Sequence, residues 1–223
     1  MMYYSASMNT LDESLMNAVK EGKLLESSRT NIRLLLDGIE SPIAREAVEE
    51  LAAAGEWQEL NDRFYKTLAF GTGGLRGRTI GSIVTRAEQG NGGVNGRPEY
   101  PCVGTACMNY FNVGRAMRGL IIYVNKHVEA TDPGRKPRLV IGHDTRHFSR
   151  DFAEFCAKIG TDLGCDIYLF DSPRATPEIS FAIRELHADS GVVLTASHNP
   201  SHDNGFKAYF NDGAQLVPPH DKA

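Results

Sequence analysis

The stretch Arg138-Leu-Val-Ile-Gly-His-Asp-Thr-Arg146 begins the part of the sequence that decides the fold. Its apolar residues predict a buried strand at 138–142, and a helical pattern follows from Ser149 to Leu163. The same order repeats in a strand at 166–170, a helix at 176–186 and a strand at 191–195. Strands that alternate strictly with helices predict an α/β fold in which helices cover a largely parallel sheet.

Both ends of this core add to the predicted architecture. A helix at 111–128 precedes it, and Gly205–Phe210, followed by the turn residues Asn211-Asp-Gly213, predicts one antiparallel strand after it. The glycine-rich stretches Phe70–Gly77 and Gly90–Gly96 are expected to be loops, because glycine weakens regular elements. The fold class is therefore α/β, with a mixed, largely parallel sheet sandwiched by helices.

Residues 1–68 predict a helical extension that packs on the main domain at 69–223. Apolar residues recur there at helical spacing, and the clearest helix has Ser41 as N-cap, Pro42 at its first position and Gly55 at its end. Because amphipathic helices bury one apolar face, we expect the extension to cover one edge of the domain that follows.

Composition and charge argue against several classes of protein. The 223 residues carry a formal net charge of −4 and no long run of Lys or Arg, unlike an electrostatic nucleic-acid binder. The longest apolar run, Leu120–Val124, is far too short to span a bilayer, and Met1–Leu15 lacks a secretory leader pattern. None of the four cysteines stands in a Cys-x-x-Cys pair, as expected in a reducing compartment. We expect a cytoplasmic protein with a small-molecule partner and no nucleic-acid or membrane partner; these features leave the oligomeric state open.

Polar loops follow the predicted parallel strands at His143–Arg146, Asp171–Pro177 and Thr195–Pro200. In parallel sheets, ligands bind in the crevice beyond the carboxyl ends of the strands. The last loop holds Ser197 beside His198, and a serine hydroxyl needs activation before it attacks an acyl or phosphoryl group.

Two kinds of serine chemistry are compatible with that loop. The Gly-x-Ser-x-Gly elbow of many serine hydrolases is absent around Ser197, which argues against acyl transfer. The cations Arg76, Arg146 and Lys207, together with the backbone N–H groups of the glycine-rich loop, instead suit an anionic phosphate.

Four stretches of the chain resemble the motifs of one family. Thr195-Ala-Ser-His-Asn-Pro200 resembles the active-site serine motif of the alpha-D-phosphohexomutases, the family of phosphoglucomutases and phosphomannomutases. Phe70-Gly-Thr-Gly-Gly-Leu-Arg-Gly77, Gly142-His-Asp-Thr-Arg146 and Asn204-Gly-Phe-Lys207 resemble three further segments of the family, and all four keep the family's order. The helical extension and the segment from Asn211 to Asp221 are most similar to the longer branch, which includes phosphopentomutase-like enzymes.

This resemblance implies the N-terminal domain I of an intramolecular phosphotransferase that interconverts hexose 1-phosphate and hexose 6-phosphate. It implies that Ser197 carries a phosphate, and that a sugar bisphosphate forms and turns over in the site. It also implies magnesium, with the phosphate on Ser197 as one ligand, and a sugar bisphosphate activator such as glucose 1,6-bisphosphate. The family's metal loop, sugar-recognition loop and distal phosphate site belong to later domains, so we expect this chain to be inactive by itself.

The resemblance also assigns roles to single residues. Catalytic roles fall to Ser197, His198, Lys207 and Arg76. Phosphate-binding or supporting roles fall to Thr72, Gly73, Asp144, Arg146 and Asn199. The planar guanidinium of Arg76 can hold two phosphate oxygens at once, and Lys207 and His198 are the candidates for the acid and base that move the sugar hydroxyl proton. Arg146, held by Asp144, is expected to support the serine loop.

Other interpretations stay open beside this one. The chain could be a non-catalytic phosphosugar-binding domain, or part of a phosphopentomutase, and neither glucose nor mannose phosphate is favoured. Two histidine pairs, His143 with His147 and His198 with His202, have the spacing of metal ligands on a helix but fall in predicted loops, which argues against a zinc site. Gly90–Gly96 lacks the Gly-Lys-Ser/Thr of a nucleotide-binding loop.

Overall fold

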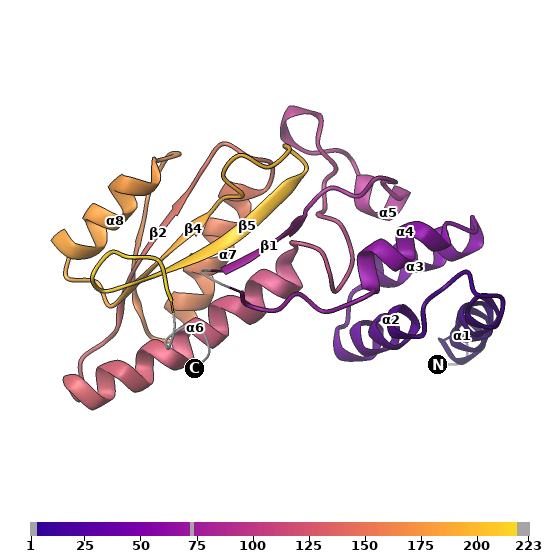
Figure 1. The fold of residues 1–223 in the computed structure, drawn as a ribbon, viewed down its shortest axis with the longest axis horizontal. Coiled ribbons are helices and arrows are strands. Elements are labelled where there is room, and N and C mark those ends of the chain that lie inside the picture. Colours follow the sequence, from indigo (N-terminus) through magenta and orange to yellow (C-terminus); the bar gives the residue numbers. More distant parts are fainter. Residues whose placement is uncertain (1–3, 72–73, 218–223) are drawn as a thin grey trace. The chain divides into compact units, whose positions relative to one another are not determined.

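The computed structural model describes residues 4–71 and 74–217, with side chains from residue 10 onward. The chain forms two compact units (Figure 1). The first consists of the chain up to Leu68 and the segment Ile80–Cys107, and the second consists of Ala69–Thr79 and the chain from Met108 onward. The division predicted from the sequence, at residue 68, differs from this one because it leaves 80–107 in the second domain. Among the described residues, no helix has both the length and the apolar character needed to cross a membrane.

The first unit is helical. Its helices are α1 (Tyr4–Lys20), α2 (Glu26–Gly38), α3 (Pro42–Ala53), α4 (Trp57–Phe64), the short α5 (Arg86–Gln89) and the 3-10 turn η1 (Val94–Gly96). Helix α3 begins as predicted, because Oγ of Ser41 accepts a hydrogen bond from the N–H of Ala44 at 3.3 Å. The side chains of Ile32, Leu51, Leu60 and Phe64 are buried and form the centre of this unit.

A buried arginine attaches the segment 80–107 to helix α4. The side chain of Arg63 is 1% exposed and forms ion pairs with Glu59 at 2.8 Å and with Glu88 at 2.5 Å. It also donates to the carbonyl of Ile83 at 2.5 Å. Glu88 in turn accepts a hydrogen bond from the N–H of Val103 at 2.8 Å. These contacts explain why this segment belongs to the first unit.

The second unit has the predicted α/β architecture. Its elements are β1 (Gly74–Arg78), α6 (Tyr110–Thr131), β2 (Arg138–His143), α7 (Ser149–Asp162), β3 (Asp166–Leu169), α8 (Thr176–Glu185), β4 (Ser190–Leu194) and β5 (Asp203–Phe210). The sheet order is β1-β5-β4-β2-β3. Strand β2 is parallel to β3 and β4, whereas β5 is antiparallel to β4 and β1. The mixed sheet confirms the predicted fold class.

Strand β1 corrects the prediction that Phe70–Gly77 is wholly a loop. Gly74–Arg78 pairs antiparallel with β5 along its length, so β1 runs in the same direction as β2, β3 and β4. Of the five described strands, β5 is therefore the one antiparallel member, as predicted. A Cβ on Gly74 would lie 1.9 Å from the carbonyl oxygen of Phe206. Here glycine permits the close approach of two strands.

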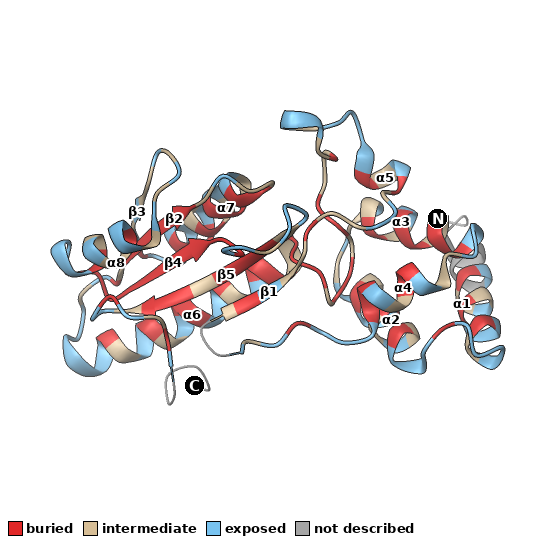
Figure 2. Ribbon diagram, turned by 45° about the horizontal axis from the view of Figure 1, so that its top comes forward, coloured by how far each residue is buried: buried red, intermediate tan, exposed pale blue. Residues whose placement is uncertain are grey.

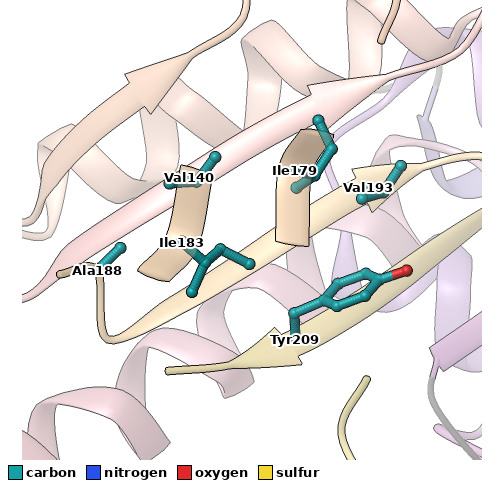
Figure 3. Packing of buried hydrophobic residues seen from close by; sticks show 6 residues of the cluster. All are labelled: Val140, Ile179, Ile183, Ala188, Val193 and Tyr209. Atoms are coloured by element: carbon teal, nitrogen blue, oxygen red, sulfur yellow. The ribbon is translucent and has the colours of Figure 1, made fainter. Parts of the chain in front are cut away.

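Helices cover both faces of the sheet. On one face, Ile179 and Ile183 of α8 pack against Val140 of β2, Val193 of β4 and Tyr209 of β5 (Figure 3). On the other face, Phe210 of β5 contacts Tyr123 and His127 of α6. Adjacent residues of a strand point to opposite faces, so α8 and α6 lie on opposite sides. The two strands between them, β2 and β4, are almost entirely buried (Figure 2).

Candidate functional site

The polar loops after the parallel strands meet at one edge of the sheet, as predicted. Strands β2 and β4 are parallel neighbours that end at His143 and Leu194, so the loops that follow them start side by side. The N–H of Asp144 donates to the carbonyl of Leu194 at 3.2 Å, and the N–H of Arg174 donates to the carbonyl of His143 at 3.1 Å. These bonds bring the loop after β3 to the same edge.

Ser197 lies on the exposed part of the loop after β4. Its backbone has φ of 59°, in the left-handed region, where a residue other than glycine is uncommon. The preceding residues, Thr195 and Ala196, are buried, whereas Ser197 and His198 are exposed. The loop therefore leaves the core at Ser197, which is exposed.

Arg146 fastens this loop to the end of β2. Its two terminal nitrogens donate at 2.8, 2.5, 2.6 and 3.1 Å to four backbone carbonyls, those of Ser197, Asn199, Pro200 and Asp203. Its Nε lies 3.3 Å from Oδ2 of Asp144. A guanidinium has five N–H donors, and the four on the terminal nitrogens of Arg146 are matched by these four carbonyls. This geometry fits a supporting role.

Asp144 is the common acceptor beneath the loop. Its Oδ1 accepts the N–H of Arg146 at 2.9 Å and the hydroxyl of Ser149 at 2.7 Å. Its Oδ2 accepts the hydroxyl of Thr195 at 2.5 Å, and Oγ1 of Thr195 accepts the N–H of Ser197 at 2.9 Å. No role for Thr195 was predicted from the sequence. A threonine two residues before a loop amide is the pattern of a side-chain turn, which is the signal that could have identified it.

Asn199 and Asn204 stabilise the return of the chain to strand β5. Nδ2 of Asn199 donates to Oδ2 of Asp203 at 2.9 Å. Nδ2 of Asn204, a buried residue, donates to the carbonyl of His147 at 2.9 Å and to Oγ of Ser149 at 3.0 Å. Asn199 thus shapes the loop, as its predicted supporting role requires.

Lys207 and Arg76 lie on one face of the sheet, on neighbouring strands. Gly74 is the register partner of Lys207, and Arg76 is the partner of Gly205, so alternation puts Arg76 and Lys207 on the same face. This is the face on which α8 packs, since Tyr209 is two residues beyond Lys207 on β5. The side chain of Arg76 is exposed and that of Lys207 is half-buried.

Burial, and after it the positive charge of Arg76, lower the pKa of Lys207, whereas the charge of Asp144 opposes this shift. A lysine with a lowered pKa is deprotonated more readily than an exposed one and is better suited to accept a proton. The structure thus gives Lys207 an electrostatic property that fits its predicted role. His198, the other predicted acid or base, is exposed. Two predicted phosphate-binding residues, Thr72 and Gly73, lie outside the described residues.

The described residues do not form a magnesium site. No group of three or more His, Cys, Asp or Glu side chains in the described part of the chain is placed to hold a metal ion. Magnesium prefers six oxygen ligands, and the predicted set includes one, the phosphate on Ser197. Both oxygens of the nearby Asp144 already accept protein donors.

Comparisons with known proteins agree with the motifs. Residues 86–223 match the family model described as phosphoglucomutase/phosphomannomutase, alpha/beta/alpha domain I. A phosphoglucomutase of Staphylococcus epidermidis is 37% identical over 159 residues, which are 71% of this chain and 24% of that protein. A phosphoribomutase of Saccharomyces cerevisiae is 32% identical over 186 residues, which are 82% of this chain and 26% of that protein.

A solved structure shares the fold. A Thermus thermophilus protein assigned as a phosphomannomutase has a TM-score of 0.50 and 25% sequence identity, over 70% of this chain and 29% of that one. The chain spans about a quarter of the length of the curated relatives that it matches. Because the family model covers more than half of the chain, and a relative that is 37% identical matches 71% of it, the chain belongs to the phosphoglucomutase/phosphomannomutase family.

Proposed function

We propose that this chain supplies the phosphoserine-carrying part of a phosphosugar mutase that interconverts hexose 1-phosphate and hexose 6-phosphate. The observation that carries the proposal is the exposed Ser197 at the carboxyl edge of the sheet, on a loop whose carbonyls are held by Arg146. Phosphoryl transfer depends on positioning and charge stabilisation more than on covalent chemistry by the protein. A rigidly held carrier group meets the first requirement.

The proposed reaction consists of two transfers. In the first, the Oγ–P bond of phosphorylated Ser197 breaks and a bond forms between the phosphorus and a hydroxyl oxygen of the sugar monophosphate. The hydroxyl proton passes to a base, and Oγ of Ser197 receives a proton from an acid. The sugar bisphosphate then presents its other phosphate, and the same steps in reverse return that phosphoryl group to Ser197.

Lys207 and Arg76 are the residues that we propose to act on the reacting groups. The lowered pKa of Lys207, caused by burial first and by the charge of Arg76 second, makes its neutral amine more available as a base. Arg76 is exposed on the same face and has a planar fork for the phosphate on Ser197. His198 is the second candidate for proton transfer, and Thr72 and Gly73 are proposed to add backbone contacts to the phosphate.

We propose that the complete protein also uses groups from outside this chain. Magnesium would neutralise charge on the transferred phosphoryl group, and its remaining ligands would come from later domains. A sugar bisphosphate such as glucose 1,6-bisphosphate is proposed as activator, and later domains would read the sugar and hold the distal phosphate. A cytoplasmic location is proposed as well, since none of the four cysteines forms a disulfide in this structure.

A pentose phosphate is the second candidate substrate. The match to the phosphoribomutase of Saccharomyces cerevisiae covers 82% of the chain, whereas the match to the Staphylococcus epidermidis phosphoglucomutase covers 71%. This observation favours comparing ribose 1-phosphate with the hexose phosphates in any assay.

The test is a coupled assay on the natural full-length protein with magnesium and glucose 1,6-bisphosphate. Glucose 1-phosphate, mannose 1-phosphate and ribose 1-phosphate are compared. Ser197→Ala is expected to abolish turnover, because it removes the phosphate carrier, and Ser201→Ala, a change of an exposed serine in the same region, is the matched control. Mass spectrometry should locate a phosphate on Ser197. If the parent turns over no sugar phosphate, or if Ser197→Ala is as active as its parent, the mutase proposal fails and a non-catalytic binding domain replaces it.

A further inference from the structure

The backbone of Ser197 is held by two consecutive hydrogen bonds that end at a carboxylate. The N–H of Ser197 donates to Oγ1 of Thr195 at 2.9 Å, and Oγ1 of Thr195 donates to Oδ2 of Asp144 at 2.5 Å. An ionised carboxylate can only accept, so the one hydrogen of the Thr195 hydroxyl must point to Asp144. The lone pairs of that hydroxyl are then left for the Ser197 amide, which fixes the direction of both bonds.

Thr195 is itself fixed by the sheet. Its N–H donates to the carbonyl of Gly205 in β5 at 3.0 Å, and the residue is 6% exposed. A Cβ on Gly205 would lie 2.5 Å from the Thr195 carbonyl oxygen, so the two backbones are in close contact. The Thr195 hydroxyl therefore connects a rigid strand end to the loop that carries Ser197.

Ser197 is the residue whose backbone needs this support. Its φ of 59° is strained for a residue with a Cβ, and such strain persists only where the surroundings impose it. Arg146 binds the carbonyl of Ser197 at 2.8 Å, and Thr195 binds its N–H. The two polar backbone groups of Ser197 are thus held from two sides, and both supports lead to Asp144.

We propose that Thr195 is a positioning residue for phosphoryl transfer, an inference that rests on the function proposed above. Its hydroxyl couples the Ser197 amide to Asp144 and so sets the direction in which Oγ of Ser197, and the phosphate on it, leave the loop. Thr195 does not bind the phosphate, because its one hydrogen is donated to Asp144. Its removal therefore affects the rate of transfer and not the binding of the sugar.

Three variants of the natural full-length protein test this role. Thr195→Val keeps the shape of the side chain and removes the hydroxyl, whereas Thr195→Ser keeps the hydroxyl. Thr161→Val is the matched control, because the Thr161 hydroxyl donates to the carbonyl of Ala157 on the exposed side of α7. We expect Thr195→Val to lower kcat about 100-fold with KM within about threefold, since small misplacement of a reacting group has an effect of that size. Thr195→Ser and Thr161→Val should keep most of the rate.

Hydrogen exchange measured by mass spectrometry gives a readout that does not depend on activity. In peptides that contain Ser197, Thr195→Val should speed exchange by about tenfold, because an amide without its partner opens more often. Peptides from α8 should exchange as in the parent. Asp144→Asn leaves one side-chain oxygen for the donors that the two oxygens of Asp144 accept, which weakens the bond that orients the Thr195 hydroxyl. It takes the place of the valine variant if that variant does not fold.

The outcomes separate this inference from the mutase proposal. Parental kcat in Thr195→Val, an equal loss in Thr195→Ser, or unchanged exchange around Ser197 would each overturn the positioning role. A parent protein that turns over no sugar phosphate would overturn the mutase proposal and, with it, any role in transfer. Exchange would in that case still show whether the hydroxyl of Thr195 holds Ser197.

Discussion

Replacement of Arg63 by methionine is expected to destabilise the first unit by about 3–5 kcal/mol, the usual effect of removing one partner from a buried ion pair. The guanidinium is 1% exposed and lies 2.8 Å from Glu59 and 2.5 Å from Glu88. Methionine has a similar length, so the change removes charge and donors with little change of volume. Two carboxylates that are 4% and 2% exposed then lose their cation.

Urea unfolding followed by tryptophan fluorescence measures this effect locally. The sequence has one tryptophan, Trp57, which is the first residue of α4, the helix that also carries Arg63. The free energy of unfolding of a unit of this size falls by about 1–3 kcal/mol per M of urea. The expected destabilisation therefore lowers the urea concentration at the unfolding midpoint by about 2 M. Single domains have stabilities of about 5–15 kcal/mol, so the variant should fold only marginally.

Two further variants decide between loss of the ion pair and loss of packing. Arg33→Met in α2 is the matched control, because Arg33 is 56% exposed and lies 3.9 Å from Asp12. It should cost less than about 1 kcal/mol, as exposed ion pairs do. Adding Glu88→Gln to Arg63→Met should recover part of the loss, since glutamine removes the unpaired charge and keeps an oxygen for the Val103 amide. A destabilisation by Arg63→Met no larger than that by Arg33→Met would refute the reasoning.

Two predictions concern the candidate site in the natural full-length protein. Burial is the largest cause of the lowered pKa of Lys207, and the positive charge of Arg76 is the second. Arg76→Met removes that charge, so the pKa of Lys207 should rise. If neutral Lys207 is the base, kcat/KM rises with pH through the pKa of Lys207. The rising limb of the pH profile should therefore move to higher pH in Arg76→Met. A rising limb that stays in place or moves to lower pH contradicts the proposed base. Arg146→Lys keeps the charge but has too few donors for the five oxygens that Arg146 faces, and kcat should fall about 100-fold through misplacement of Ser197. Steady-state kinetics with a rate within threefold of the parent would contradict this role.

The sequence predicted the elements whose signals are local. Strands β2 and β4 are apolar runs followed by polar loops, and α3 has an N-cap serine with proline at its first position. Such signals depend on residues that are close together in the sequence, so they can be read without knowledge of tertiary contacts. The parallel order of the strands predicts that the loops after them meet at the carboxyl edge, which is why the sequence alone places Ser197 near Arg146.

Two features of the fold depend on contacts that are distant in sequence. The two glycines of β1 predict a loop when only the sequence is considered. The segment forms a strand because it pairs with β5, which lies so close that no side chain fits at Gly74. The segment 80–107 joins the first unit through Arg63, whose partner Glu88 is 25 residues away. An isolated arginine in a helix gives no sign that it will be buried. For the same reason, the sequence indicated a supporting role for Arg146 but not the carbonyls that it binds.

The energetics of the serine loop indicate that this part of the site is formed before any ligand arrives. Left-handed backbone at a residue with a Cβ costs about 1–2 kcal/mol, and Ser197 has that conformation. A hydrogen bond to a charged donor contributes about 1.5–3 kcal/mol, and Arg146 makes four of them to carbonyls of this loop. Even if the contributions of these bonds are far from additive, their combined stabilisation exceeds the free-energy cost of the left-handed backbone at Ser197. The loop should therefore keep its shape whether or not Ser197 carries a phosphate, and any movement needed to present the second phosphate of a bisphosphate must occur in the sugar or in parts of the protein outside this loop.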